Sequence, residues 1–152
     1  MKQIESFKVN HDILEKGLYL SRIDKNTKTY DLRMKLPNNG DYFTMEQAHT
    51  IEHLAATVLR SSKFSDEIVY FGPMGCATGF YLVVFNIPYE ALKDLLIKTF
   101  DFIAAYEGEI PGATRVECGN YKAHDLENAK ILAEDYSKIL RQCTEESLKY
   151  KE

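Results

Sequence analysis

The chain has 152 residues, of which 45% are hydrophobic and 28% are charged, and its formal net charge is −4. This size and composition are typical of a single folded domain over residues 1–152, and they exclude an intrinsically disordered chain. Only three cysteines are present, so the closed set of disulfides found in small secreted proteins is not expected.

The charge and hydropathy patterns argue against nucleic acids and membranes as partners. Lys and Arg number 19 against 23 Asp and Glu, and no basic stripe interleaved with aromatic residues is present. The longest apolar run, residues 80–85, is far shorter than the roughly 20 residues that a membrane helix needs. The first residues contain no apolar signal segment. We therefore expect a cytoplasmic protein with reduced thiols.

The N-terminal part of the chain predicts a short strand followed by a hairpin. Residues 5–9 form the short strand, and residues 17–23 and 29–36 pair around the polar turn 24–28. Residues 37–41 contain Pro, Asn and Gly, which break the strand pattern.

A capping signal then predicts a helix over residues 45–61. Thr44 and Gln47 have the spacing of a capping box, in which each side chain bonds the backbone of the other residue. The apolar stripe expected for this helix consists of Ala48, Ile51, Leu54 or Ala55, Val58 and Leu59.

Residues 67–71 and 77–86 are rich in β-forming residues and flank a glycine-containing loop. Pro88 is suited to start a helix whose apolar face comprises Leu92, Leu95, Leu96, Thr99 and Ile103. Asp125 can cap a further helix, with a stripe formed by Leu126, Ala129, Leu132, Ala133, Tyr136 and Leu140. Thr144 opens a short last helix. This order predicts an α+β fold with a mostly antiparallel sheet packed against helices.

The sharpest chemical signal is the run from His49 to His53. On a helix these two histidines lie one turn apart and share a face, which is the spacing at which two imidazoles bind one metal ion. Glu52 lies beside the same site and can act on metal-bound water or on substrate without being a ligand. The simpler interpretation is a solvated helical turn with two surface histidines.

A metal site needs at least a third protein ligand, and the candidates are Cys76, Cys118, Cys143, His11 and His124. Cys118 lies at a predicted strand-to-loop break, and Cys76 lies in a glycine-flanked turn that exposes one side chain. The residues alone do not decide between these two. Cys143 is expected to be a bystander and His124 a structural residue at a helix entry. Two histidines and one cysteine leave a coordination position open, as in catalytic sites, and suit zinc, ferrous iron or cobalt.

Several motifs occur together along nearly the whole chain. They are Glu5-Ser6-Phe7, Asn10-His11, Tyr30-Asp31-Leu32-Arg33, Pro37-Asn38, His49-Thr50-Ile51-Glu52-His53-Leu54, Pro73-Met74-Gly75-Cys76-Ala77-Thr78-Gly79-Phe80-Tyr81, Cys118-Gly119 and His124-Asp125-Leu126-Glu127. The histidine motif alone is shared with inverted zinc peptidases. The combination with the two cysteine motifs resembles the S-ribosylhomocysteine lyase family, which makes the precursor of the signal autoinducer-2.

The resemblance implies a role for each matching residue. It implies that the metal ligands are His49, His53 and Cys118. It implies that Glu52 and Cys76 form the acid/base pair. It places three residues around the homocysteine portion of the substrate, namely Ser6, His11 and Arg33. Read without the resemblance, these three are a turn hydroxyl, a surface histidine and a strand-end surface charge.

The resemblance also implies cofactor, partner and reaction. The expected cofactor is one divalent metal per subunit, ferrous iron first, with zinc or cobalt as replacements. The expected assembly is a homodimer with its active sites at the subunit interface. The reaction converts S-ribosylhomocysteine to homocysteine and 4,5-dihydroxy-2,3-pentanedione by two carbonyl migrations and a β-elimination.

Three positions depart from the family pattern. Tyr70 and Gly72 stand where an Asp and a Ser commonly precede the Pro-Met-Gly-Cys turn, and Lys35 stands where many members have Cys or another residue. The usual Asp lies close to the substrate site in the family, so its loss bears on substrate detail and rate more than on the metal centre.

Two other hypotheses fit parts of the pattern. An inverted zinc peptidase would use Glu52 as the base for water and would need a downstream carboxylate ligand from Glu107, Glu109 or Glu117. It would leave Cys76 idle. A structural-zinc or metal-storage module, or a relative that has lost catalysis, is the non-enzymatic alternative, and Tyr70 is the feature that favours it.

Overall fold

Four strands with alternating apolar residues form one antiparallel sheet. The computed structural model describes residues 1–152. In chain order the elements are α1 (Glu5–Lys8), β1 (Gly17–Asp24), β2 (Thr27–Arg33), α2 (Met45–Arg60), η1 (Ser65–Glu67), β3 (Ile68–Pro73), β4 (Gly79–Val84), α3 (Tyr89–Ala104), α4 (Leu126–Gln142) and η2 (Glu146–Leu148). The strand order is β1-β2-β4-β3, and every neighbouring pair is antiparallel. The predicted α+β class and antiparallel sheet are confirmed.

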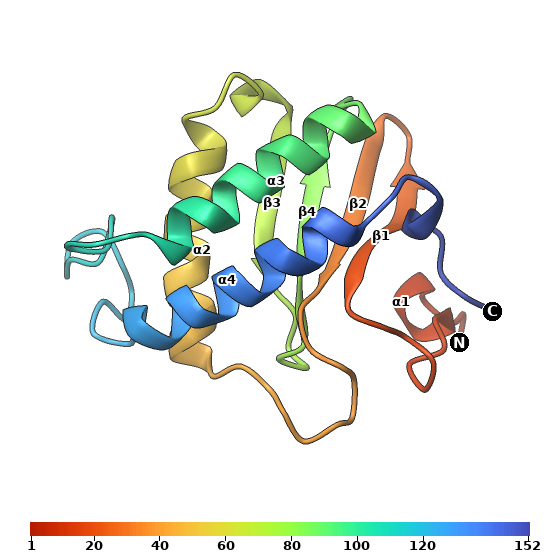
Figure 1. Cartoon of the computed structure of the whole chain (residues 1–152), viewed down its shortest axis with the longest axis horizontal. Coiled ribbons are helices and arrows are strands. Elements are labelled where there is room, and N and C mark those ends of the chain that lie inside the picture. The colour runs from red at the N-terminus through yellow and green to blue at the C-terminus, as the bar shows by residue number, and fades with distance from the viewer.

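Helices α2, α3 and α4 cover one face of the sheet (Figure 1). They and the sheet share one core of 28 buried residues, to which β2 contributes Tyr30 and Leu32 and β4 contributes Phe80, Leu82 and Val84. Asp31 and Arg33 alternate with Tyr30 and Leu32, so their side chains leave the sheet on the opposite face. The fold is therefore one α+β domain with a helical side and a second, partly open side.

The three long helices form where their capping residues and apolar stripes predict them. The Thr44 side chain accepts from the Gln47 backbone, and the Gln47 side chain accepts from the Thr44 backbone, so the predicted capping box is present. Pro88 occupies the N-cap of α3, and the Asp125 side chain caps α4 by accepting from Asn128 N–H. The predicted apolar faces of α3 and α4 are buried, apart from the partly buried Leu126. Val58 is only partly buried in α2.

Two local predictions are wrong. Residues 5–9 contain the one-turn helix α1, closed by a Glu5–Lys8 ion pair of 2.9 Å, because local bonding prevails where no neighbouring strand offers a ladder. Cys118 follows no strand, since residues 105–125 form a chain of turns. The predicted short last helix is present as a single 3₁₀ turn, Glu146–Leu148. In addition, β2 ends at Arg33 instead of residue 36, because the N–H groups of Met34 and Lys35 both bond to Thr78 O.

None of the helices combines the length and the apolar character that crossing a membrane would require.

Candidate metal centre

The second and third turns of α2 present the histidine pair. The His49 and His53 rings are 4.6 Å apart between centroids and nearly perpendicular. His49 Nδ1 lies 2.8 Å from Ala123 O, and His53 Nδ1 lies 2.7 Å from Pro111 O. A carbonyl oxygen can only accept, so each Nδ1 carries the proton and each Nε2 keeps a lone pair. The loop between α3 and α4 thereby holds both rings in the tautomer that a metal ion requires.

The same loop supplies the thiol. Cys118 Sγ lies 3.4 Å from His49 Nε2, although the two residues are 69 positions apart in sequence. Asn120 N–H donates to Cys118 Sγ at 3.5 Å, a contact that supports negative charge on sulfur. The two predicted histidines and Cys118 are therefore brought together, whereas Cys143 is buried at the end of α4 and takes no part.

A third histidine completes the cluster. The His124 ring stacks on His49 with centroids 4.0 Å apart and an interplanar angle of 18°. Its Nδ1 lies 3.0 Å from Thr50 Oγ1, which also accepts from Asp125 N–H. Its Nε2 is buried and has no hydrogen-bond partner. Burial, together with His49 and His53, lowers the pKa of His124 to about 4, so the ring is neutral near pH 7.

Among the candidate ligands in the sequence, His124 is expected to be a structural residue at a helix entry. It does lie directly before the N-cap Asp125, but its Nε2 side also belongs to the site. Ligand atoms of His49, His53, Cys118 and His124 all lie within 4.8 Å of one another. The spacing of six residues from Cys118 to His124 is the feature of the sequence that could have placed His124 near the metal. Turns of this length, however, bring two side chains together only in particular conformations.

The cluster has the donor set of a zinc, ferrous or cobalt site. Imidazole nitrogens and a thiolate are borderline-soft ligands, and the second nitrogens of the rings are already bonded to protein oxygens. The orphaned Nε2 of His124 shows that the polar interior of the cluster is not satisfied by the protein alone. No glutamate belongs to the cluster, and Glu117 accepts from Thr114 Oγ1 at 2.8 Å instead. The peptidase hypothesis therefore lacks its carboxylate ligand.

A second group of polar residues lies around Cys76, in the turn between β3 and β4. Cys76 is exposed, and its Sγ lies 3.0 Å from Thr78 Oγ1 and 3.8 Å from Arg33 Nη1. Arg33 is only 3% exposed, so it is not a surface charge. Its Nη1 donates to Thr78 Oγ1 at 2.8 Å, and its Nη2 donates to Asp31 Oδ2 at 2.7 Å. Nε of Arg33 is buried without a partner.

Two of the other predicted site residues, His11 and Ser6, line different cavities. His11 and Cys76 both line a cavity of about 170 Å³, and His11 Nδ1 lies 2.9 Å from Val9 O. Ser6 lines a different cavity of about 300 Å³ together with Tyr70 and Tyr81. Glu52 is partly buried on α2, next to the ligand candidate His53.

Asp31 and Thr78 hold the Arg33 and Cys76 side chains, and neither is among the site residues predicted from the sequence. Asp31 and Arg33 are two positions apart on one strand and so share a face, a signal that identifies an ion pair once the strand is known.

Comparison with known proteins agrees with this geometry. The family model "S-Ribosylhomocysteinase (LuxS)" matches residues 4–147. The chain is 44% identical over 157 aligned residues to the S-ribosylhomocysteine lyase of Finegoldia magna, covering 100% of both chains. It is 45% identical to that of Borreliella afzelii, covering 99% of both, and 41% identical to that of Clostridium acetobutylicum, covering 100% of both. The chain belongs to the S-ribosylhomocysteinase (LuxS) family.

Proposed function

We propose that this chain cleaves S-ribosylhomocysteine to homocysteine and 4,5-dihydroxy-2,3-pentanedione, the precursor of autoinducer-2. The observation that carries the proposal is the cluster of His49, His53 and Cys118 in a chain that matches the S-ribosylhomocysteine lyase family end to end. The reaction is a metal-dependent carbon–sulfur bond cleavage without net oxidation or added water.

The chemistry requires repeated movement of protons on carbon. The ribose opens to its aldehyde, and the carbonyl group then moves from C1 to C2 and from C2 to C3. With the carbonyl at C3, the proton at C4 is acidic enough for β-elimination of the thiol. Each stage removes a proton from one carbon, returns a proton elsewhere and develops negative charge on oxygen, so it needs an acid/base group and an electrophile.

His49, His53 and Cys118 are the residues that would hold a divalent metal, and ferrous iron is the first choice, with zinc or cobalt as replacements. When bound, the metal supplies Lewis acidity toward substrate oxygens. The carbonyls of Ala123 and Pro111 orient the two imidazoles for this task. His124 directs a neutral imidazole toward the same space, and we expect it to support the cluster without replacing one of the three ligands.

Cys76 and Glu52 are the proposed acid/base pair. Cys76 Sγ is exposed beside the Arg33 guanidinium, a position from which the sulfur can exchange a proton with substrate carbon. Thr78 Oγ1, 3.0 Å from the sulfur, restricts its rotamer. Glu52 projects from the helix that carries both histidines, so its carboxylate can move a proton at substrate atoms near the metal.

Ser6, His11 and Arg33 are the proposed contacts to the homocysteine portion. His11 shares a cavity with Cys76, which supports a place for it beside the reacting end of the substrate. Nε–H of Arg33 has no hydrogen-bond partner in the chain, so a substrate carboxylate that displaces the groups covering it would satisfy this donor. Ser6 offers a hydroxyl from α1.

We further propose that residues 1–152 function as one domain in a cytoplasmic homodimer with its active sites at the subunit interface. The exposed thiol of Cys76 requires a reducing compartment to stay active. The division of the site residues between two cavities is consistent with a site that a second subunit completes.

The decisive experiment is a thiol-release assay with S-ribosylhomocysteine under anaerobic conditions, using protein loaded with ferrous iron. We expect stoichiometric homocysteine from the wild type. The Cys76→Ala variant should retain its metal and lose turnover. Absence of thiol release from protein with confirmed metal would refute the activity, and full turnover by Cys76→Ala would remove Cys76 from the mechanism.

A further inference from the structure

A chain of buried hydrogen bonds joins the C-terminal segment to the Cys76 thiol. Tyr150 Oη donates to Asp31 Oδ2 at 2.7 Å, and Arg33 Nη2 donates to the same oxygen at 2.7 Å. At its other end the guanidinium donates to Thr78 Oγ1 at 2.8 Å and lies 3.8 Å from Cys76 Sγ. The Tyr150 phenol is thus linked through Asp31 and Arg33 of β2 to the sulfur of Cys76, the proposed acid/base group.

The ion pair of Asp31 and Arg33, in the middle of these hydrogen bonds, is buried. Asp31 is 1% exposed and Arg33 is 3% exposed. Buried ion pairs hold their geometry only when further hydrogen bonds compensate for the lost hydration. Asp31 Oδ1 has no partner, so the carboxylate depends on the two donors to Oδ2. Tyr150 is the donor that comes from outside β2.

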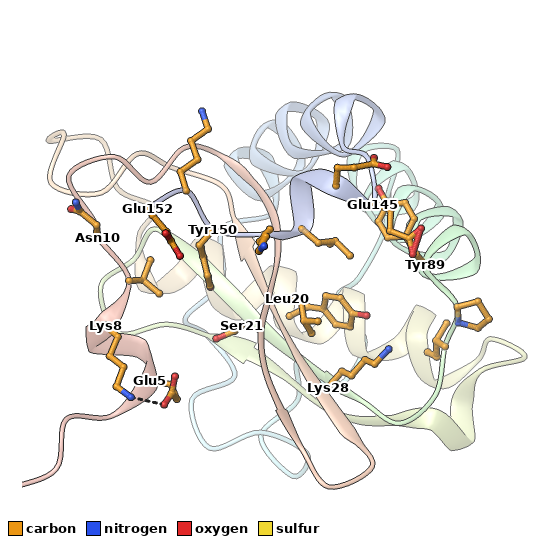
Figure 2. Close-up of a pocket in the computed structure, with 18 of the residues that line it drawn as sticks. Glu5, Lys8, Asn10, Leu20, Ser21, Lys28, Tyr89, Glu145, Tyr150 and Glu152 are labelled. Carbon is orange, nitrogen blue, oxygen red and sulfur yellow. Dashed lines mark hydrogen bonds and ion pairs between the residues drawn. The ribbon is translucent and has the colours of Figure 1, made fainter.

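The C-terminal segment holds Tyr150 in place by several contacts. The Tyr150 ring stacks on Tyr19 of β1 with centroids 4.8 Å apart, and Lys151 forms a 2.9 Å ion pair with Glu15. Figure 2 shows Tyr150 on this segment, where it lines a cavity of about 990 Å³ together with Ser21 of β1. Burial and the neighbouring Asp31 raise the pKa of Tyr150, so its hydroxyl remains a donor over the working pH range.

We propose that Tyr150 is a positioning residue for the Cys76 thiol, because its hydroxyl holds Asp31, and through Asp31 the Arg33 guanidinium, in contact with the sulfur. With the phenol present, the charge of the Asp31 carboxylate is shared between two donors. Without the phenol, the Asp31 carboxylate accepts hydrogen bonds from Arg33 alone and attracts the guanidinium more strongly. Water can then also reach the ion pair. Both effects weaken the support that Arg33 gives to a Cys76 thiolate. The proposal rests on the acid/base role of Cys76 proposed above.

Of the titratable groups around Cys76, only Asp31 is hydrogen-bonded to Tyr150. Those that surround the thiol are Arg33 and Asp31 from β2, Tyr81 from β4, and His11 and Tyr42 from the loops that line the same cavity. A shift in the reactivity of Cys76 on substitution of Tyr150 therefore reports on the hydrogen-bond chain.

The test measures the rate of Cys76 alkylation by iodoacetamide as a function of pH in full-length, metal-loaded protein. Tyr150→Phe keeps the ring and removes only the hydroxyl. The hydroxyl acts on the sulfur only through Asp31 and Arg33, so we expect the midpoint of the pH profile to move upward by only about half a pH unit and the rate at neutral pH to fall about threefold. A chain ending at Lys149 should show a larger shift. Cys76→Ala supplies the background from Cys118 and Cys143.

Lys151→Ala is the matched control, because it breaks the ion pair with Glu15 in the same segment and leaves the Tyr150 hydroxyl in place. Its alkylation profile should coincide with that of the wild type. An unchanged profile in Tyr150→Phe, with metal content and unfolding temperature preserved, would overturn the proposal. The alkylation assay needs no substrate, so it remains decisive even if thiol release from S-ribosylhomocysteine fails.

Discussion

At the scale of single residues, the candidate metal site contains three proposed ligands and one further histidine. Cys118 Sγ and the Nε2 atoms of His49 and His53 converge, and His124 adds a buried nitrogen that no protein group satisfies. Ligands contribute bonds to the ion directly, whereas supporting residues change metal affinity by about 10–100-fold.

Substitutions at Cys118 and His124 should therefore differ in their effect on metal binding. Cys118→Ser is expected to purify without stoichiometric metal. His124→Phe retains the stacked ring and loses the nitrogen, so it should keep metal with an affinity about 10–100-fold weaker. Elemental analysis and competition with a chelator measure both effects. Equal loss of metal in both variants would identify His124 as a fourth ligand and favour a structural site.

Tyr70 and Gly72, the two departures from the family pattern, are physically coupled. A Cβ atom at Gly72 would overlap the phenol of Tyr70, which lies across the glycine. Gly72→Ser should therefore destabilise the protein by up to about 1 kcal/mol, since the half-exposed ring can partly swing away. In the Tyr70→Ala background the same serine should be nearly neutral. Urea denaturation of the four proteins gives the coupling energy, and additive effects would contradict the contact.

At the scale of secondary-structure elements, the start of α2 supports the site. Its capping box closes the turn that directly precedes His49. Thr44→Ala should lower the free energy of unfolding by about 1 kcal/mol, because the backbone N–H of Gln47 loses its acceptor. Thr44→Ser keeps the acceptor and should lose much less. Chemical denaturation of the metal-free proteins checks this, and equal stability of all three would show that the cap contributes nothing.

The stability that the contact between α3 and α4 contributes depends on pH. Arg141 Nη2 donates to Asp101 Oδ2 at 2.7 Å, and hydrogen bonding to Arg141 holds the pKa of Asp101 below its usual 3.8. The stability from this pair is fully present above pH 3.8 and is lost as the pH falls through the lower folded-state pKa. Both groups are about half exposed, so the gain is only about 0.2–1 kcal/mol.

Asp101→Asn should consequently destabilise the protein at pH 7, and the difference from wild type should shrink below pH 3.8. Denaturation across this pH range measures it. Glu134→Gln, which breaks a looser 3.9 Å pair with Lys138 inside α4, is the control. A difference that grows on acidification would have the wrong sign for this mechanism.

At the scale of the whole molecule, the proposed dimer predicts sharing of residues between chains. Light scattering should give twice the mass of the 17.5 kDa chain. A mixed dimer of Cys118→Ser with Ser6→Ala, His11→Ala or Cys76→Ala should regain up to about half of wild-type activity in at least one pairing, because one of its two sites then carries no lesion. A monomer, or failure of every pairing, would refute interface sites.

The sequence by itself determined the three long helices and the histidine pair of the site. The capping pair at Thr44 and Gln47 and the one-turn spacing of His49 and His53 are local properties, because a helix places residues four apart on one face wherever it forms. The apolar stripes of α3 and α4 were equally readable, since burial of one face is set by a repeat of 3.6 residues.

Only the tertiary structure decided which distant groups meet. Cys118 reaches His49 across 69 positions through a chain of turns that has no periodicity to read. Tyr150 reaches Asp31 across 119 positions because the last residues return along β1. Such contacts depend on how packed elements place the ends of their loops, and no local propensity encodes that placement. The same physics explains why α1 was mistaken for a strand, since a strand exists only where a partner lies beside it.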